Sequence, residues 1–157
     1  MTLKDKLLAD MKEAMKGKEA SKLELAVIRM VRSAIKNAEI EKKRDLEEEE
    51  IMDILAREVK IRQDAIDSIP DKQQESRQAD IDRLKEEKKI LQEYLPAPLS
   101  DPEIKEAARE AIASTGVSSP KEMGRVMGVL MPRLKGRADG NKVKKVVQEM
   151  LSGEESD

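Results

Sequence analysis

Tyr94 is the only aromatic residue in this chain of 157 residues, which contains no Phe, Trp, His or Cys. Aliphatic side chains and methionine must therefore supply almost the whole hydrophobic core. Because strands are typically rich in aromatic and β-branched residues, this composition favours helices over a sheet. Charged residues make up 41% of the chain, but the net charge is only −2 and apolar residues recur at helical spacing. These properties indicate a folded helical protein with solvated charged faces.

The missing residue types also restrict the chemistry that the chain can perform. Without Cys there is no disulfide and no thiolate nucleophile, and without His the Ser-His-Asp triad and the usual zinc ligand sets are absent. We therefore assign no catalytic residue and expect no metal and no other cofactor. The sequence shows no secretory signal and no apolar run long enough to span a membrane, so we expect a cytoplasmic protein without a membrane partner.

Apolar spacing predicts four helices in the first part of the chain. They cover residues 3–16, 21–43, about 45–69 and 71–94, and the third begins at a capping signal formed by Asp45 and Glu48. The break at Pro70 predicts that the last two helices form a long antiparallel hairpin. The apolar stripe of the fourth helix is thin, so we expect this helix to project and to expose residues such as Ile90.

Glu58 and Arg62 lie four residues apart inside the apolar stripe of the third predicted helix. The simpler interpretation is a local ion pair at the edge of the stripe. The alternative is a specific contact from these side chains to a neighbouring helix.

A change of character at residues 94–100, with the sequence YLPAPLS, predicts a domain boundary, because two prolines stiffen a short connection. We predict an N-terminal helical domain over 1–95, a linker over 96–100 and a small three-helix domain over 101–152. The first two helices of the second domain are expected over 101–115 and from Pro120 to about Met131, where Pro132 should bend or end the helix. A loop over 134–140 then precedes a last short helix, whose inward residues are Val143, Val146, Val147 and Met150, and a frayed tail over 152–157. The fold class is therefore all-α.

Basic residues are concentrated between residues 121 and 150. This segment contains eight basic and three acidic residues, although the whole chain has a net charge of −2. One interpretation is a surface that contacts backbone phosphates of RNA; the other is ordinary solvated charge. The lack of aromatic residues argues against stacking on unpaired bases. The candidate RNA-binding residues are Lys121, Arg125, Arg133, Lys135, Arg137, Lys142 and Lys145.

Glycines and methionines in the same region have simpler explanations. Gly124, Gly128, Gly136 and Gly140 would shape the basic surface, and the first two, four residues apart, would permit close packing of helices. Met123, Met127 and Met131 could form an adaptable binding surface, but core packing is the favoured interpretation.

Three stretches of the sequence resemble a known family. Residues 119–140, SPKEMGRVMGVLMPRLKGRADG, followed by Val143, Val146 and Val147, resemble the GatB/YqeY domain. Residues 25–42, LAVIRMVRSAIKNAEIEK, and residues 94–100 are similar to the stand-alone YqeY-like proteins in particular. The resemblance covers essentially the whole chain.

The resemblance implies an all-helical fold and a role linked to tRNA. The related module is the C-terminal tail of the B subunit of the glutamine-dependent amidotransferase that acts on Glu-tRNA(Gln) or Asp-tRNA(Asn), where the tail is associated with holding the tRNA body. The family label of carbon-nitrogen ligase with glutamine as amide donor would not describe this chain alone, because it lacks both the ATP-dependent cradle domain and the amidase. Three hypotheses follow: a non-catalytic tRNA-binding module, an adaptor that docks on an amidotransferase or an aminoacyl-tRNA synthetase, and a direct contributor to amidation.

Overall fold

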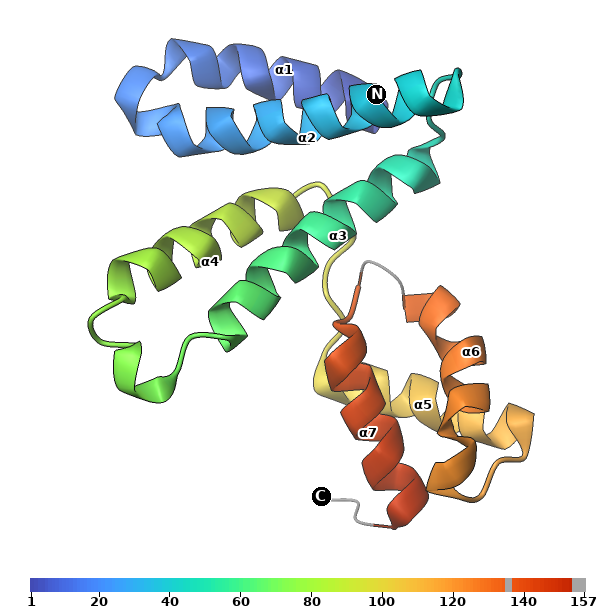
Figure 1. Ribbon diagram of the computed structural model, residues 1–157. Coiled ribbons are helices and arrows are strands. Elements are labelled where there is room, and N and C mark those ends of the chain that lie inside the picture. Colours follow the sequence, from blue (N-terminus) through green and yellow to red (C-terminus); the bar gives the residue numbers. More distant parts are fainter. Residues whose placement is uncertain (135–136, 154–157) are drawn as a thin grey trace. The chain divides into compact units, whose positions relative to one another are not determined.

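The structure of the chain, a computed structural model, describes residues 1–134 and 137–153, and these residues are folded into helices without any strand (Figure 1). The predicted all-α class is therefore confirmed. Contacts between residues divide the chain into two compact units, Met1–Pro96 and Ala97–Asp157, which we call the first and the second unit.

The first unit consists of two helical hairpins that meet through one helix. Helix α1 runs beside α2, α3 packs along α4, and α2 contacts both α3 and α4 (Figure 1). Short 3-10 helices, η1 and η2, lie in the loops of the two hairpins. The elements are α1 (Leu3–Lys16), η1 (Lys18–Ser21), α2 (Lys22–Lys42), α3 (Glu48–Asp67), η2 (Asp71–Gln73) and α4 (Gln78–Gln92).

The core of the first unit is aliphatic, as the composition requires. Tyr94 closes one side of it: its hydroxyl donates to a carboxylate oxygen of Asp10 at 2.5 Å, and the ammonium of Lys6 lies 5.2 Å from the ring centre. The buried members of this core are Leu7, Val27, Ile28, Val31, Ile35, Leu46, Ile51, Leu55, Leu91 and Tyr94.

The turn between α2 and α3 corrects the predicted start of α3. The capping box is formed by Glu47 and Glu50, not by Asp45 and Glu48, since the Glu47 side chain accepts from the third amide of the helix and the Glu50 side chain accepts from the Glu47 amide. Leu46 is buried and fixes the chain just before this box. The burial of Leu46 in the turn thus accompanies a helix start at Glu48, which the spacing of the acidic residues alone did not predict.

Glu50 also binds the end of α2, so it connects two helices across the turn. Its carboxylate accepts from Arg44 Nη1 at 2.8 Å and from the ammonium of Lys42. These hydrogen bonds hold the pKa of Glu50 well below its ordinary value of 4.5. The negative charge of Glu50 is thus more favourable in the folded state than in the unfolded chain.

We expect Glu50→Gln to lower the melting temperature at neutral pH and to have a smaller effect in acid. A lowered pKa in the folded state contributes stability above about pH 4.5, the ordinary pKa of the group, and this contribution is lost as the pH falls through the folded-state pKa. Thermal denaturation of both proteins between pH 7 and pH 2 measures the difference. A gap that stays constant over this range would contradict the expectation.

Helix α4 is shorter than predicted and does not project. It begins at Gln78, after the 3-10 helix Asp71–Gln73, because no apolar residue lies between Pro70 and Gln78 to anchor an earlier start. Ile81 and Leu91 are buried, and Ile90 packs against the core. The thin apolar stripe is therefore buried or half-buried, with Leu91 in the core of the first unit and Ile90 against it, and it leaves α4 no exposed apolar face of the predicted kind.

Arg62 makes both of the contacts that the sequence left as alternatives. Its Nη1 donates to Glu58 Oε2 at 2.7 Å on the same helix, and its Nη2 lies 3.4 Å from Glu87 Oε1 on α4. A third contact runs from Nη2 to the sulfur of Met30 on α2 at 3.3 Å. The guanidinium is therefore a buried charge that joins three helices.

The second unit is a bundle of three helices with its own aliphatic core. Its elements are α5 (Asp101–Thr115), the 3-10 helix η3 (Pro120–Glu122), α6 (Met123–Leu134) and α7 (Gly140–Ser152). Each α-helix contacts the other two. The buried residues are Ile104, Ala108, Ala111, Val117, Val126, Leu130, Leu134, Val143 and Val147.

Two expectations for this unit meet different outcomes. Met123, Met127 and Met131 pack against the core, which confirms the favoured interpretation of these residues. Pro132 does not end α6 at Met131, because the helix continues to Leu134 with the proline in its last turn. There the proline removes only one hydrogen bond near the end of the helix.

The expectation of a frayed tail concerns residues 152–157. Of these, Ser152 is the last residue of α7, and residues 154–157 lie outside the described part of the chain.

The segment expected to be a linker, 96–100, is bonded to the second unit. The Leu99 amide donates to the Arg137 carbonyl at 2.8 Å, and Arg137 Nε donates to the Ala97 carbonyl at 3.2 Å. Ser100 then caps α5 by accepting from the Glu103 amide. The segment that contains the two prolines is therefore held to the second unit at Ala97, Leu99 and Ser100.

Candidate nucleic-acid interface

The C-terminal basic surface consists of the described candidate residues Lys121, Arg125, Arg133, Arg137, Lys142 and Lys145. All except Arg137 are exposed, and they lie on or beside α6 and α7 on the sides that face away from the core. Lys135, the remaining candidate cation, and Gly136 lie outside the described residues. The sequence therefore identified side chains that are available to solvent.

Three of these cations already have acidic partners. Arg125 Nη1 lies 3.7 Å from Glu122, Arg133 Nη2 lies 3.6 Å from Glu110, and Lys142 binds the carboxylate of Asp101 at the start of α5. The hydrogen bond from Lys142 lowers the pKa of Asp101. All three pairs are exposed, so each is weak and a phosphate can replace the carboxylate at small cost.

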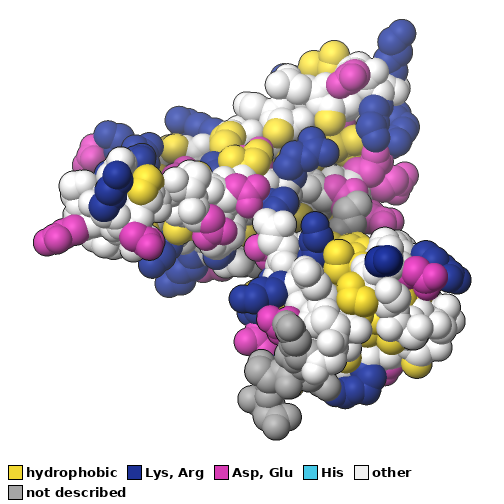
Figure 2. Space-filling view, turned by 60° about the horizontal axis from the view of Figure 1, so that its bottom comes forward, with side chains coloured by type: hydrophobic (Ala, Val, Ile, Leu, Met, Phe, Trp, Pro, Cys, Tyr) yellow, Lys and Arg dark blue, Asp and Glu magenta, His cyan; other side chains and the backbone are white. Residues whose placement is uncertain are grey.

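Basic and acidic side chains are also interspersed on the visible surface of the molecule. In Figure 2, Lys and Arg side chains lie beside Asp and Glu side chains over much of the face shown. The excess of cations between residues 121 and 150 is therefore partly neutralised by Glu110 and Asp101 of α5, two carboxylates that lie outside the counted segment.

Arg137 has a structural contact that separates it from the other candidates. Its Nε donates to the Ala97 carbonyl and its own carbonyl accepts from the Leu99 amide, and the side chain is only half exposed. A guanidinium has five N–H donors, so the remaining ones can still reach a phosphate. Changing Arg137 would nevertheless disturb the segment 97–99 as well as any contact with RNA.

Gly124 and Gly128 do not permit close packing of helices, contrary to the expectation from their spacing. A Cβ atom added at either position would meet no atom within 4 Å among the described residues beyond its neighbours and the nearby backbone of α6, and both glycines are exposed. Gly140 differs, since its added Cβ would lie 3.6 Å from the Met131 methyl. The two α6 glycines therefore leave helix backbone exposed to solvent close in sequence to Arg125.

Gly128→Ala is expected to raise the free energy of unfolding of the second unit by about 1 kcal/mol. Alanine is the better helix former, and the open space around Gly128 leaves room for its methyl group. Chemical denaturation followed by circular dichroism measures the change. A loss of stability would show that the methyl group meets an obstacle, and a loss of RNA affinity at increased stability would show that Gly128 shapes the binding surface.

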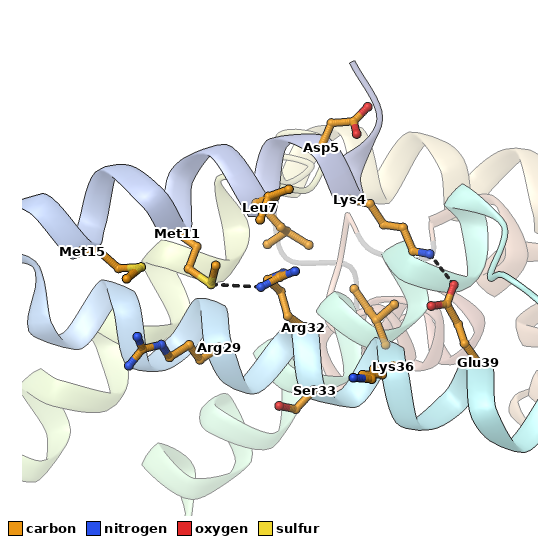
Figure 3. A pocket seen from close by; sticks show the side chains of 12 residues that line it. Lys4, Asp5, Leu7, Met11, Met15, Arg29, Arg32, Ser33, Lys36 and Glu39 are labelled. Atoms are coloured by element: carbon orange, nitrogen blue, oxygen red, sulfur yellow. Dashed lines mark hydrogen bonds and ion pairs between the residues drawn. The ribbon is translucent and has the colours of Figure 1, made fainter.

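The sequence analysis missed a second basic surface, in the first unit. Between residues 25 and 38 the chain has three cations, Arg29, Arg32 and Lys36, and no acidic residue. They line one wall of an open groove of about 820 Å³ between α1 and α2, shown in Figure 3. A charge count made only over residues 121–150 did not reveal them, whereas their spacing of three and four residues would have placed them on one helix face.

Neither a metal-binding cluster nor a membrane span is found among the described residues. Within residues 1–134 and 137–153, no cluster of at least three acidic, His or Cys side chains is placed to hold a metal ion. In the same part of the chain, no helix combines the length and the apolar character that crossing a bilayer requires. The features that stand out are two basic surfaces, one in each helical unit, whose described cations are exposed except for the half-buried Arg32 and Arg137.

These features define an all-helical protein of two units with a basic surface on each. Comparison with family models gives a more specific answer: the chain belongs to the family of YqeY-like proteins, whose model matches residues 4–151. This match confirms the resemblance seen in the sequence over nearly its whole length. Among proteins with curated descriptions, none matches the chain.

Proposed function

We propose that this chain is a non-catalytic module that binds tRNA, and that the C-terminal basic surface contacts the phosphates. The observation that carries the proposal is the concentration of cations between residues 121 and 150, eight basic against three acidic, in a chain whose net charge is −2. Phosphate contacts of Lys and Arg supply affinity without reading the sequence of the RNA. The resemblance to the tail of the amidotransferase B subunit makes tRNA the preferred RNA.

The exposed side chains of Lys121, Arg125 and Lys145 are the strongest contributors in this proposal. Among the described residues, Lys121 and Lys145 form no ion pair, and Arg125 has only its exposed pair with Glu122. Lys142 and Arg133 would have to exchange a carboxylate for a phosphate. With one aromatic residue, buried in the first unit, stacking on bases makes no contribution to this surface.

The test is binding of labelled bulk tRNA to the full chain over a series of salt concentrations. Affinity should fall steeply with salt, because bound counterions are released from the phosphates. The variant with Lys121, Arg125 and Lys145 all changed to Glu should bind more weakly, and its slope of log affinity against log salt should be shallower by about 1 for each lost contact.

A matched control places the same change of charge elsewhere. Lys72, Lys85 and Lys89 are exposed on η2 and α4 of the first unit, and their change to Glu should leave tRNA affinity within about twofold, apart from long-range repulsion that salt screens. Equal loss of binding in both variants would show a general charge effect and not a site. Unchanged binding in the first variant would remove the C-terminal basic surface from the proposal.

A direct contribution to amidation and docking on a synthetase or an amidotransferase remain less supported candidates. The predicted basis for docking was an exposed apolar face on α4, and α4 instead uses its apolar residues against the core. We therefore propose RNA binding first.

A further inference from the structure

The groove between α1 and α2 combines an apolar wall with a cationic wall in the first unit. It is about 820 Å³ in volume, open to solvent, and lined by residues between Lys4 and Met15 on α1 and between Arg29 and Glu39 on α2. At 1.5 Å per residue, each of these segments is about 16 Å long, or three turns of helix. The groove is part of the first unit and shares no residue with the C-terminal basic surface.

The wall from α1 presents an apolar row, Leu8, Met11 and Met15. The three residues are spaced by three and four positions, so they lie on one face of the helix. Met15 is 53% exposed, and Leu8 and Met11 are half-buried, whereas the groove floor is closed by the buried Leu7 and Ile35. Methionine side chains are flexible and polarisable, which suits a surface that adapts to a partner.

The wall from α2 presents a cationic row, Arg29, Arg32 and Lys36, with the same spacing of three and four positions. Figure 3 shows the only contact drawn for this row, from Arg32 Nη1 to the sulfur of Met11 at 3.0 Å. A thioether is a weak acceptor, and within the described part of the chain no ion pair involves the row. The cationic row is therefore a set of charges without acidic partners in the described residues, exposed at Arg29 and Lys36 and half-buried at Arg32.

The other charges at the groove are already paired. Lys4 at the end of the groove binds Glu39 at 2.5 Å, and Asp5 accepts from the Thr2 amide in the capping box of α1. The hydrogen bond between Lys4 and Glu39 lowers the pKa of the carboxyl and raises the pKa of the ammonium. The groove thus has a neutralised end and an uncompensated positive side.

We propose that this groove binds an amphipathic helix of a partner protein, one that carries an apolar row beside a row of Asp and Glu. The apolar row and the cationic row lie side by side, and each repeats every three and four residues. A partner helix presents its own side chains with the same repeat, so it can match both rows at once. The apolar row of the partner would cover Leu8, Met11 and Met15. Its carboxylates would neutralise Arg29, Arg32 and Lys36 across a span of about 10 Å.

RNA fits this groove less well than it fits the second unit. Phosphates would satisfy the cationic row, but they would leave the apolar row beside it in water, and the groove offers no aromatic side chain for stacking on a base. The apolar row is therefore the feature that distinguishes a protein helix from RNA as the occupant.

The test uses the full chain and four synthetic helical peptides of about 16 residues, long enough to fill the groove. The first has Leu at a spacing of three and four with Glu along one flank; the second replaces each Glu by Lys; the third replaces each Leu by Ala; the fourth has the first peptide's residues in scrambled order. Methyl-labelled methionine gives separate signals for the groove, at Met11 and Met15, and for the second unit, at Met123 and Met127. We expect only the first peptide to shift the Met11 and Met15 signals, with Met123 and Met127 unchanged.

Variants then test the two rows separately. Arg29, Arg32 and Lys36 changed together to Glu should weaken binding of the first peptide at least about tenfold, as loss of several interfacial charges does. Met15→Glu, at an exposed position, should do the same through the apolar row. The change of Lys72, Lys85 and Lys89 to Glu, with the same effect on net charge, should leave the affinity within about twofold. Circular dichroism of each variant establishes that it is folded.

Three results would overturn the proposal. They are a first peptide that fails to shift Met11 and Met15, equal binding of the Lys and Glu peptides, and unchanged affinity in the triple variant. If bulk tRNA, added in place of the peptide, shifts the two groove methionines while the peptides do not, the groove is an RNA surface and the protein-helix proposal is wrong. The tRNA proposal for the second unit is tested with different variants. A failure of that proposal can therefore be told apart from a failure of the groove proposal.

Discussion

Replacing Arg62 by methionine should lower the free energy of unfolding of the first unit by about 3 kcal/mol, a typical cost of breaking a buried ion pair from one side. The Arg62 side chain is 9% exposed, and it lies between Glu58 and Glu87, which are 20% and 16% exposed. Methionine leaves two half-buried carboxylates on α3 and α4 without their shared cation. Chemical denaturation followed by circular dichroism measures the loss.

The loss of unfolding free energy should come from the carboxylates of Glu58 and Glu87, which no longer have a cation beside them, and not from the absence of the arginine itself. Changing Glu58 and Glu87 to Gln in the Arg62→Met background should therefore recover most of the lost stability, since it removes the uncompensated charge. Arg83→Met is the matched control, because Arg83 is 72% exposed and lies 4.0 Å from Glu87, and it should change stability by less than about 0.5 kcal/mol. A double substitution that restores nothing would show that Arg62 acts through packing alone.

Leu130→Ala should cost the second unit about 3 kcal/mol, in the range of leucine truncations in closed cores. Leu130 is completely buried among residues of α5, α6 and α7. We expect the loss to be confined to residues after Ala97 if the two units fold independently, as the predicted domain boundary implies. Hydrogen exchange read by mass spectrometry resolves the two units, because peptides from each report its own opening.

Leu55→Ala provides the reciprocal control, because Leu55 is equally buried in the core of the first unit. It should accelerate exchange before Pro96 and leave the second unit protected. If either substitution accelerates exchange equally in both units, the chain is a single cooperative domain and the predicted boundary is wrong.

Helix existence and most helix ends were predictable because local signals determine them. The capping residues Thr2 and Ser100 start α1 and α5, and Gly116 ends α5 in the left-handed conformation that glycine adopts easily. The aliphatic stripes identified the cores of both units. These features depend on side chains within one or two turns of each other, which a sequence displays directly.

Contacts between distant segments were not predictable in the same way. The pairing of Arg62 with Glu87 needs α3 and α4 to be aligned, and the pairing of Lys142 with Asp101 needs α7 to be beside the start of α5. The exposed state of Gly128 depends on which face of α6 the bundle covers. Within the candidate site, the sequence identified which cations are present but not which of them carboxylates had already neutralised.

Tyr94 gives the first unit an intrinsic near-ultraviolet optical signal, whereas the second unit has none. As the only aromatic residue, it supplies all the intrinsic fluorescence and near-ultraviolet absorption of the chain, and it belongs to the first unit. Burial, and after it the hydrogen bond to Asp10, raises the pKa of its hydroxyl, so the phenolate absorbance should appear in alkali only when that unit opens. Fluorescence unfolding curves therefore describe residues 1–96, and the RNA surface proposed for the second unit needs a signal of its own, such as a labelled RNA.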